Sequence, residues 1–477
     1  MALPSAPLAM RRIADLPGPP GIPLLGNALQ VKLNRIHLDV EQWGRTYGPF
    51  FRFRLGRMTA LAITDHELIA SILKDRPDGF RRTSRTTVVG MEMGLKPGVF
   101  GAEGQAWRDQ RRMVMASFAP GHVRGYFPSL LKVTLRLRGR WRAAARQGST
   151  IPLQEDLMRY TVDGVAGLAF GTDVNTLESD QEVIQQHLDK IFPALFRRIF
   201  APFPYWRYLR LPADRALDRS VAAINQAIAR FIAQARERMR QNPALREQPG
   251  NLLEAMIVAA DQGDSGVGDE HVAGNVLTML LAGEDTTANT LAWMIYLLQR
   301  NPQALQRATE EVRRIAPDPA GFTPEQMASL DYLEACASET MRLKPVGPFL
   351  VLEALRDTTL ADIQVPTGTF VWCVLRHDSV SAQHFPDPLA FDPARWLEGS
   401  APALTPSSPK RVAMPFGAGP RVCPGRYLAM LEIKMAMAML LSSFEIESVS
   451  TPDGGEPREH MAFAMAPVGL SLRLRER

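Results

Sequence analysis

The residues best suited to chemistry lie near the end of the chain, where a single cysteine stands between glycines and prolines. The segment Phe416–Gly425 reads FGAGPRVCPG, and we expect a helix directly after it, from Arg426 to Ser442. Glycines let the backbone bend close to a flat cofactor, and the positive end of the helix dipole favours a thiolate over a thiol. The alternative is a turn that holds a buried cysteine as a small core residue. A lone thiolate displayed in this way suits axial ligation of a metal.

The spacing of five residues resembles the haem-binding loop of the cytochrome P450 family of haem-thiolate monooxygenases: Phe416, Gly419, Arg421, Cys423 and Gly425. The resemblance implies that Cys423 is the proximal iron ligand and that Phe416 packs near its sulfur. It also implies that Arg421 pairs with a haem propionate and that Gly425 leaves its amide free to approach the thiolate. These roles agree with the chemistry, because a buried anionic sulfur needs donors and a propionate needs a cation.

A second candidate site lies in the middle of one long predicted helix, from about Asp269 to Arg300. The helix opens on acidic residues and stops before the Asn301–Pro302 pair. It is apolar on nearly all sides, which predicts burial in the protein, with a membrane span as the alternative. Two adjacent carboxylates, Glu284 and Asp285, would be costly at the centre of a bilayer, so we favour the buried helix.

The segment Ala282–Thr287 (AGEDTT) resembles the oxygen-activation motif of the same family. Without the resemblance, a kinked helix with satisfied side chains is an alternative, because threonine hydroxyls can bond the preceding turn. The resemblance implies that Asp285 and Thr286 lie beside the distal face of the haem. Dioxygen cleavage needs protons inside a pocket that excludes water, so we expect Asp285 to pass protons inward and Thr286 to hydrogen-bond the bound oxygen. Glu284 is expected on the solvent side or in a structural role.

An ion network is expected to support the cysteine loop. Glu339 and Arg342 are three residues apart on one predicted helix face, close enough for an ion pair, although surface helices often carry such pairs. The segment Phe391–Trp396 (FDPARW) follows, and together these motifs resemble a buried Glu-Arg-Arg network of the family. The resemblance implies that Glu339, Arg342 and Arg395 hold the haem loop. This chain has Ala394 where the family often has glutamate.

Trp107 and Arg111 are four residues apart and therefore face the same side of a helix. An indole N–H and a guanidinium suit a carboxylate, and this WxxxR pattern resembles the propionate-binding helix of the family; an interfacial tryptophan beside a solvated arginine is the alternative. Family members often carry a basic residue shortly after the ExxR helix, but Leu352 stands there. The expected propionate partners are therefore Trp107, Arg111 and Arg421, with His377 as a further candidate.

The stretch Ile191–Trp206 is rich in aromatic residues and interrupted by prolines, which suits a mobile hydrophobic lid, with core packing as the alternative. In the layout of the family it corresponds to the cover of the access channel. The expected substrate-pocket residues are Phe100, Ala282, Phe349 and Phe463. These segments carry few charges, so we expect a lipophilic substrate such as a terpenoid, a steroid, a fatty acyl chain or a polyketide.

The composition narrows the class of protein. The chain has 477 residues, 46% of them hydrophobic, which is enough to bury a large core. The net charge of +5 comes mostly from scattered arginines without a long basic run, which does not support nucleic-acid binding. The three cysteines include no CxxC pair and therefore predict neither disulfides nor a zinc framework, which fits a reducing cytoplasm.

We expect residues 1–16 to form a flexible N-terminal extension without a membrane anchor, and residues 17–477 to form one domain. The first ten residues include two prolines, and the basic pair Arg11–Arg12 follows them, where a signal peptide would place its charge first. The segment Leu16–Pro23 (LPGPPGIP) should be stiff and extended. It resembles the lead-in that follows the anchor of membrane-bound family members. We therefore predict a soluble, cytoplasmic protein.

The electron supply is expected from a separate protein, because the chain shows no flavin segment and no cysteine cluster for iron and sulfur. Four basic residues flank the cysteine loop: Lys410, Arg411, Arg421 and Arg426. They could attract an acidic ferredoxin or flavodoxin with its reductase, while a solvated basic surface is the alternative.

With four motifs in the family's order between Leu16 and Leu474, the chain is identified as a member of the cytochrome P450 family. Membership implies a mainly α fold with small β-sheets, and heme b (iron protoporphyrin IX) between the long central helix and the cysteine loop. It implies insertion of one atom of dioxygen into a lipophilic substrate, by hydroxylation or epoxidation. The alternatives are an enzyme that uses or rearranges peroxides, which commonly lacks the Asp285–Thr286 pair, and a non-catalytic haem gas sensor.

Overall fold

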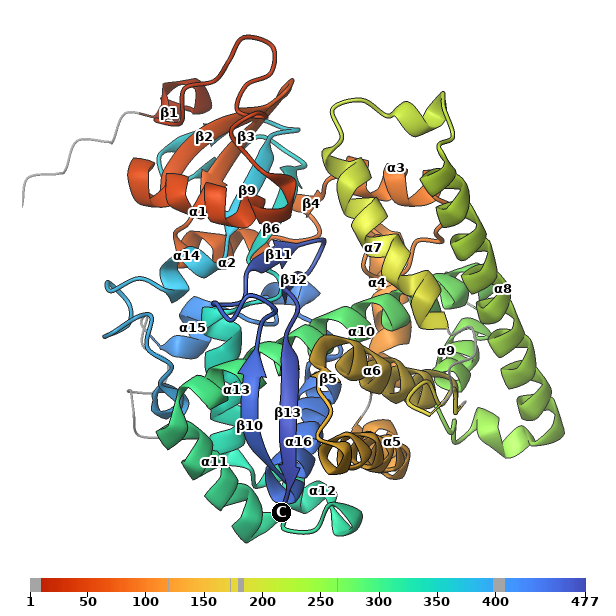
Figure 1. Cartoon of the computed structure of the whole chain (residues 1–477). Coiled ribbons are helices and arrows are strands. Elements are labelled where there is room, and N and C mark those ends of the chain that lie inside the picture. The colour runs from red at the N-terminus through yellow and green to blue at the C-terminus, as the bar shows by residue number, and fades with distance from the viewer. Residues whose placement is uncertain (1–9, 119, 172, 179–183, 264, 398–407) are drawn as a thin grey trace, which may run out of the picture. The chain divides into compact units, whose positions relative to one another are not determined.

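The computed structural model describes residues 10–118, 120–171, 173–178, 184–263, 265–397 and 408–477 (Figure 1). Most of these residues are helical and the sheets are small, which confirms the predicted fold class. The chain forms two compact units, one of residues 1–85, 347–388 and 406–422 and one of residues 86–346, 389–405 and 423–477. The predicted N-terminal extension lies outside the described residues up to residue 9, and Arg11–Arg12 form strand β1.

The first unit is built around a five-stranded sheet in the order β2-β3-β9-β6-β4. The strands are β2 (Phe50–Leu55), β3 (Met58–Ile63), β4 (Phe80–Arg82), β6 (Phe349–Ala354) and β9 (Phe370–Val374). Strands β3 and β9 are parallel, with Ile63 opposite Cys373. Parallel strands are buried on both faces, which explains why these two read as apolar runs. They therefore form the core of this unit.

Shorter elements complete the first unit. A three-stranded sheet has the order β1-β8-β7, with β7 (Thr358–Leu360) and β8 (Ile363–Val365). The helices are α1 (Ile36–Tyr47), α2 (His66–Lys74), α14 (Arg376–Ser379) and α15 (Pro409–Ala413), and a 3-10 turn spans Gly419–Arg421. Helices α2 and α14 follow the parallel strands β3 and β9, so both begin at the same edge of the sheet.

The second unit contains most of the helices. They are α4 (Gly104–Ser117), α5 (Pro120–Gln147), α6 (Leu153–Phe170), α7 (Ile184–Phe200), α8 (Pro212–Gln241), α9 (Leu252–Ala260), α10 (Asp269–Arg300), α11 (Pro302–Ile315), α12 (Pro324–Ala328), α13 (Asp331–Leu343) and α16 (Arg426–Ser443). Helix α3 (Ser84–Glu92) begins at the boundary of the two units. Helix α10 has the predicted bounds, because Pro302 cannot continue it and instead opens α11.

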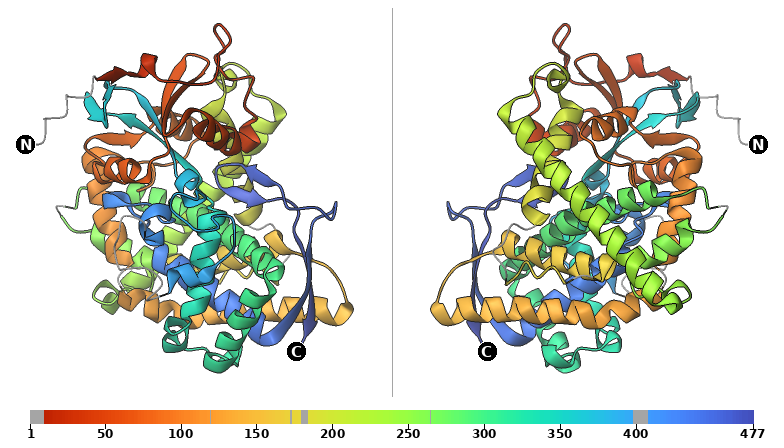
Figure 2. Two further views of the ribbon diagram at one scale, coloured as in Figure 1. Left: turned by 90° about the vertical axis from the view of Figure 1, so that its left-hand side faces the viewer. Right: turned by 90° about the vertical axis from the view of Figure 1, so that its right-hand side faces the viewer.

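The small sheets of the second unit lie near the C-terminus. Strands β10 (Phe444–Ser450) and β13 (Ser471–Glu476) form a long antiparallel pair, blue in Figure 2, with β5 (Ile151–Pro152) beside β13. Strands β11 (Glu459–Met461) and β12 (Met465–Pro467) form a separate hairpin.

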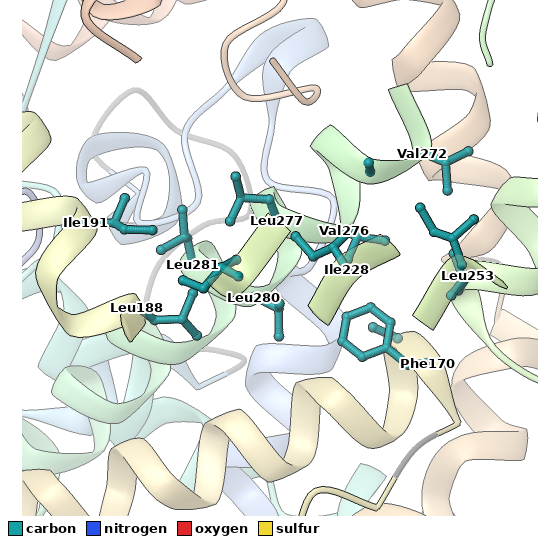
Figure 3. Packing of buried hydrophobic residues seen from close by; sticks show 14 of the residues in the cluster. Phe170, Leu188, Ile191, Ile228, Leu253, Val272, Val276, Leu277, Leu280 and Leu281 are labelled. Carbon is teal, nitrogen blue, oxygen red and sulfur yellow. The ribbon is translucent and has the colours of Figure 1, made fainter. Parts of the chain in front are cut away.

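The core of the second unit is gathered around α10. Its apolar side chains pack against residues of α6, α7, α8 and α9, as Leu277 of α10 and Phe170, Ile191, Ile228 and Leu253 of the other four helices illustrate (Figure 3). No helix among the described residues is both long enough and apolar enough to span a bilayer. The polar residues in the middle of α10 distinguish it from a membrane-spanning helix, as the sequence predicts.

Candidate functional site

Cys423 lies in the second unit, two residues before Gly425, the N-cap of α16. Burial raises the pKa of the Cys423 thiol, while the Gly425 N–H, which donates to the sulfur, and the guanidinium groups of Arg111 and Arg426 act to lower it. The helix start therefore does not by itself favour the thiolate, contrary to the sequence-based expectation, because burial is the larger effect. A coordinating metal ion deprotonates a thiol outright. We therefore expect Cys423 to become a thiolate when it binds a metal.

The other two cysteines are more deeply buried than Cys423. Cys336 in α13 and Cys373 in β9 are fully buried, and burial raises the pKa of each thiol. Cys423 is only partly buried. It is thus the one cysteine of the chain that is not fully buried, and the guanidinium groups of Arg111 and Arg426 both act on its sulfur.

The part of the loop that precedes Cys423 belongs to the first unit, with Phe416 and Arg421. Gly417 and Gly419 adopt positive φ angles of 74° and 70°, which favour glycine. A Cβ at Gly419 would lie 2.4 Å from the carbonyl oxygen of Leu73. The backbone path of the loop therefore favours glycine at both positions.

The middle of α10 leaves one face uncovered in an otherwise buried helix. Thr278, Ala282 and Thr286 are one turn apart and are partly or fully exposed, whereas most neighbouring positions are buried. On another face, a Cβ at Gly283 would lie 2.4 Å from Val165 Cγ2 of α6. The helix is therefore pressed against α6 and presents small side chains on its open face, where a flat group can approach.

Thr286 is held in place by its own helix. Its hydroxyl donates to the Ala282 carbonyl oxygen at 2.6 Å. Since the proton is used in this bond, the Oγ1 lone pairs remain as acceptors on the open face.

Asp285 is a carboxyl group with a perturbed pKa. Its Oδ1 accepts a hydrogen bond from Asn289 Nδ2 at 3.2 Å, and Gln154 Nε2 donates to Asn289 Oδ1 at 3.2 Å. Burial and the nearby Asp189 carboxylate raise the pKa of Asp285 to about 6. A group with this pKa can both hold and release a proton near neutral pH.

Glu284 does not lie on the solvent side, contrary to one of the two roles expected for it. The residue is only 4% exposed, and burial, followed by the charges of Asp189 and Asp285, raises the pKa of its carboxyl well above the ordinary value. Its side chain lies within hydrogen-bonding reach of Asp189, an exposed residue of α7. The sequence contains no signal for Asp189, because only the packing of α7 beside α10 brings it to these carboxyls.

Glu339, Arg342 and Arg395 are brought together as the resemblance implies. The Arg342 guanidinium donates to both Glu339 oxygens, at 2.8 and 2.7 Å, and both side chains are 0% exposed. Arg395 Nε lies 3.5 Å from Glu339 Oε1. Two further donors were missed: Trp396 Nε1 at 2.9 Å and the Asp392 backbone N–H at 3.0 Å. The Glu339 carboxylate thus connects α13 to residues 392–396.

Trp107 and Arg111 share one face of α4, as expected. Trp107 is buried, and burial lowers the pKa of the Arg111 guanidinium, which faces Cys423. Leu352 is a core residue of β6 in the first unit. His377 is engaged elsewhere in that unit, because its Nδ1 lies 3.1 Å from Asp378 Oδ1. This contact does not favour His377 as a propionate partner.

Two of the four expected pocket residues lie in one aromatic cluster of the second unit. The Phe463 ring stacks on Phe192 of α7 with centroids 4.2 Å apart, and its centroid lies 5.7 Å from that of Phe100. Phe463 has a φ angle of 105°, an unusual conformation for a bulky residue. Ala282 is on the open face of α10, whereas Phe349 packs on Trp372 within the first unit.

The donor set and shape in the second unit fit a haem. The Cys423 sulfur, which accepts an N–H donor, suits an iron ligand. The desolvated Arg111 guanidinium and the buried Trp107 indole suit a propionate, and the small residues on the open face of α10 suit a porphyrin plane.

Comparisons with known proteins agree with this chemistry. A family model described as Cytochrome P450 matches residues 16–474. Cytochrome P450 3A13 from Mus musculus is 24% identical over 440 residues, which cover 91% of this chain and 85% of that protein. A bifunctional cytochrome P450/NADPH–P450 reductase from Gibberella moniliformis is 26% identical over 476 residues, 98% of this chain and 41% of that protein.

The fold has solved counterparts. The heme domain of cytochrome P450DA superposes with a TM-score of 0.82 at 23% identity, covering 98% of each chain. A mutant of the same domain gives a TM-score of 0.81 at 24% identity, covering 97% of this chain and 98% of the other. Because the family model spans nearly the whole chain, the protein belongs to the cytochrome P450 family and is a haem-thiolate monooxygenase that binds heme b.

Proposed function

We propose that the Cys423 thiolate would hold the haem iron, that Asp285 would deliver protons and that Thr286 would hold the reacting group by hydrogen bonding, for hydroxylation or epoxidation of a lipophilic substrate. The observation that carries the proposal is the Cys423 thiol, which receives the Gly425 N–H and faces the Arg111 guanidinium. The bound haem supplies the activation of dioxygen, which a thiolate ligand promotes.

Different residues are proposed to bind the haem and to stabilise the structure around it. Trp107, Arg111 and Arg421 are proposed to bind the propionates through N–H donors, and Phe416 to shield the sulfur. The Glu339 network has a structural role, because its five contacts are all to groups of the protein. It keeps the segment after residue 389 attached to α13.

The acid groups on α10 supply a route for protons. Asp189 is exposed to water and lies near both Glu284 and Asp285. Because the pKa of Asp285 is about 6, its carboxyl is protonated in a useful fraction of molecules near neutral pH. Because the Thr286 hydroxyl donates its proton to the Ala282 carbonyl oxygen, its Oγ1 would act as a hydrogen-bond acceptor toward the bound group.

The residues proposed to contact the substrate favour an apolar substrate. The rings of Phe100, Phe192 and Phe463 meet from three separate segments, and the uncharged Ala282 lies on the face of α10 beside Thr286. Substrate pockets of this kind gain affinity from apolar area and orient the substrate with few polar groups. Terpenoids, steroids, fatty acyl chains and polyketides are the proposed classes.

The electron donor is proposed to be a separate acidic ferredoxin or flavodoxin with its reductase. Lys410 and Arg411 are exposed in the first unit, and Arg426 is exposed in the second. Exposed basic groups speed association with an acidic partner by long-range attraction. The three free cysteines suit the reducing cytoplasm that we propose as the location.

The test is the spectrum of the reduced holoenzyme under carbon monoxide. The wild type should show the red-shifted Soret band of thiolate ligation, and Cys423→His should lose it. Cys373→Ala, which alters a buried cysteine of the first unit, is the control and should retain the band. A histidine-type spectrum in the wild type, or an unchanged band in Cys423→His, would contradict the assignment. Product formation with dioxygen and an electron donor separates the monooxygenase from a gas sensor and from a peroxide-dependent enzyme.

A further inference from the structure

The first unit contains three histidines around one buried carboxylate. His66 Nδ1 lies 2.9 Å and His384 Nε2 lies 3.5 Å from Asp378 Oδ2. The other oxygen, Oδ1, lies 3.1 Å from His377 Nδ1. The four side chains are 7%, 15%, 11% and 19% exposed for His66, His384, Asp378 and His377. None of them has a role in the proposed haem chemistry.

The sheet explains how these distant residues meet. Strands β3 and β9 are parallel neighbours, so the chain leaves both strands at the same edge. His66 is the first residue of α2, which follows β3, and Asp378 is in α14, which follows β9. The His66 backbone N–H also donates to Asp378 Oδ2 at 3.0 Å, across 312 residues of sequence. The cluster is therefore built on regular elements of one unit.

We propose that His66, Asp378 and His384 bind a divalent transition-metal ion, with zinc as the representative. Two imidazole nitrogens and a carboxylate oxygen form a set that zinc and similar ions prefer. The three ligand atoms lie within 4.8 Å of one another. Ligand atoms bonded to one zinc ion at about 2.0–2.2 Å are roughly 3–3.5 Å apart, which agrees with the Asp378 distances.

The surroundings of the cluster also suit a metal. His377 contacts the Asp378 oxygen that is not assigned to the ion, and such outer partners orient metal-binding carboxylates. The adjacent buried cation Arg376 is neutralised, because its Nε and Nη2 both donate to Glu41, each at 2.9 Å. The ion would link the start of α2 to the segment that follows α14.

The test measures zinc in the purified holoenzyme. Protein is dialysed against a chelator, incubated with Zn²⁺ alone, passed through a desalting column and analysed for zinc per chain. The wild type should retain about one ion per chain, and His66→Gln and His384→Gln should bind at least tenfold more weakly. Glutamine can still donate a hydrogen bond to Asp378, so these variants separate metal binding from hydrogen bonding.

Controls make the result decisive. His460→Gln changes an exposed histidine of the second unit and should bind zinc as the wild type does. Zinc-edge X-ray absorption should show nitrogen and oxygen ligands with imidazole scattering and no sulfur. A wild type that retains no zinc, equal retention in all four proteins, or sulfur ligation would overturn the proposal and leave a metal-free hydrogen-bonded cluster. Haem content and circular dichroism of each variant exclude misfolding as the cause of lost zinc.

Discussion

The buried carboxylate of Glu339 provides the sharpest test of the architecture. Glu339→Gln keeps the size of the side chain but removes the charge and one acceptor oxygen, while the donors of Arg342, Arg395, Trp396 and Asp392 remain. Arg342 is 0% exposed and would become a buried, uncompensated cation. Breaking a buried ion pair by removing one partner costs about 3–5 kcal/mol.

A matched control stands on the same helix. Glu334 pairs with Lys434 at 2.8 Å, but the Glu334 side chain is 52% exposed. Water screens the half-exposed Glu334 carboxylate, although the Lys434 side chain is only 8% exposed, so Glu334→Gln should cost about 1 kcal/mol, clearly less than Glu339→Gln. The two variants make the same chemical change on α13 beside a buried cation and differ in the burial of the carboxylate.

The assay is urea unfolding of the holoenzyme, followed by tryptophan fluorescence and by the Soret band. With a slope of about 3 kcal/mol per M, Glu339→Gln should lower the midpoint by about 1 M or more. Glu334→Gln should shift it by only about 0.3 M. Equal midpoints for the two variants would refute the inference that the Glu339 network stabilises the fold through its burial.

Three further predictions concern α10 and the cysteine loop. Asp285 has a folded-state pKa of about 6, so its stabilising contribution is complete below about pH 4 and is lost as the pH rises through about 6. The unfolding free energy of the wild type relative to Asp285→Asn should therefore fall by up to about 3 kcal/mol between about pH 4 and pH 8, and a pH-independent difference would contradict the assigned pKa. Thr286→Ala should release hydrogen peroxide and lower the product formed per electron severalfold, with an unchanged spin-state shift on substrate binding; unchanged coupling argues against a proton-delivery role. Gly419→Ala should lower stability and haem occupancy more than Gly417→Ala, because only at Gly419 would the new Cβ meet a backbone atom, at 2.4 Å; equal effects would mean that φ strain alone matters.

Local motifs made much of the site predictable. The residues from Phe416 to Gly425 are consecutive, and Gly417 and Gly419 have positive φ angles, which favour glycine. The bounds of α10 were predictable because Pro302 ends it and its apolar residues demand burial. The ion pair of Glu339 with Arg342 required only helical spacing.

The electrostatic state of the site was not predictable in the same way. The helix start beside Cys423 suggests a thiolate, yet burial raises the pKa of the thiol. Glu284 and Asp285 are adjacent in the sequence, but their raised pKa values depend on burial and, after it, on the charge of Asp189, which lies on another helix. A pKa reports the dielectric surroundings and the charges of all packed neighbours, and most of those are distant in sequence.

The sequence by itself determined the family, the cofactor and the helix that carries Asp285 and Thr286. Each of these was readable because its motif lies within one helical turn or one loop. Only the tertiary structure decided that Trp396 completes the Glu339 network, that Asp189 reaches Glu284, and that His66 meets Asp378 across 312 residues. Hydrogen bonds and Coulomb interactions act over a few ångströms, whereas chain separation says little about which surfaces pack together. Strand pairing and helix packing therefore decide which of the available polar groups become neighbours.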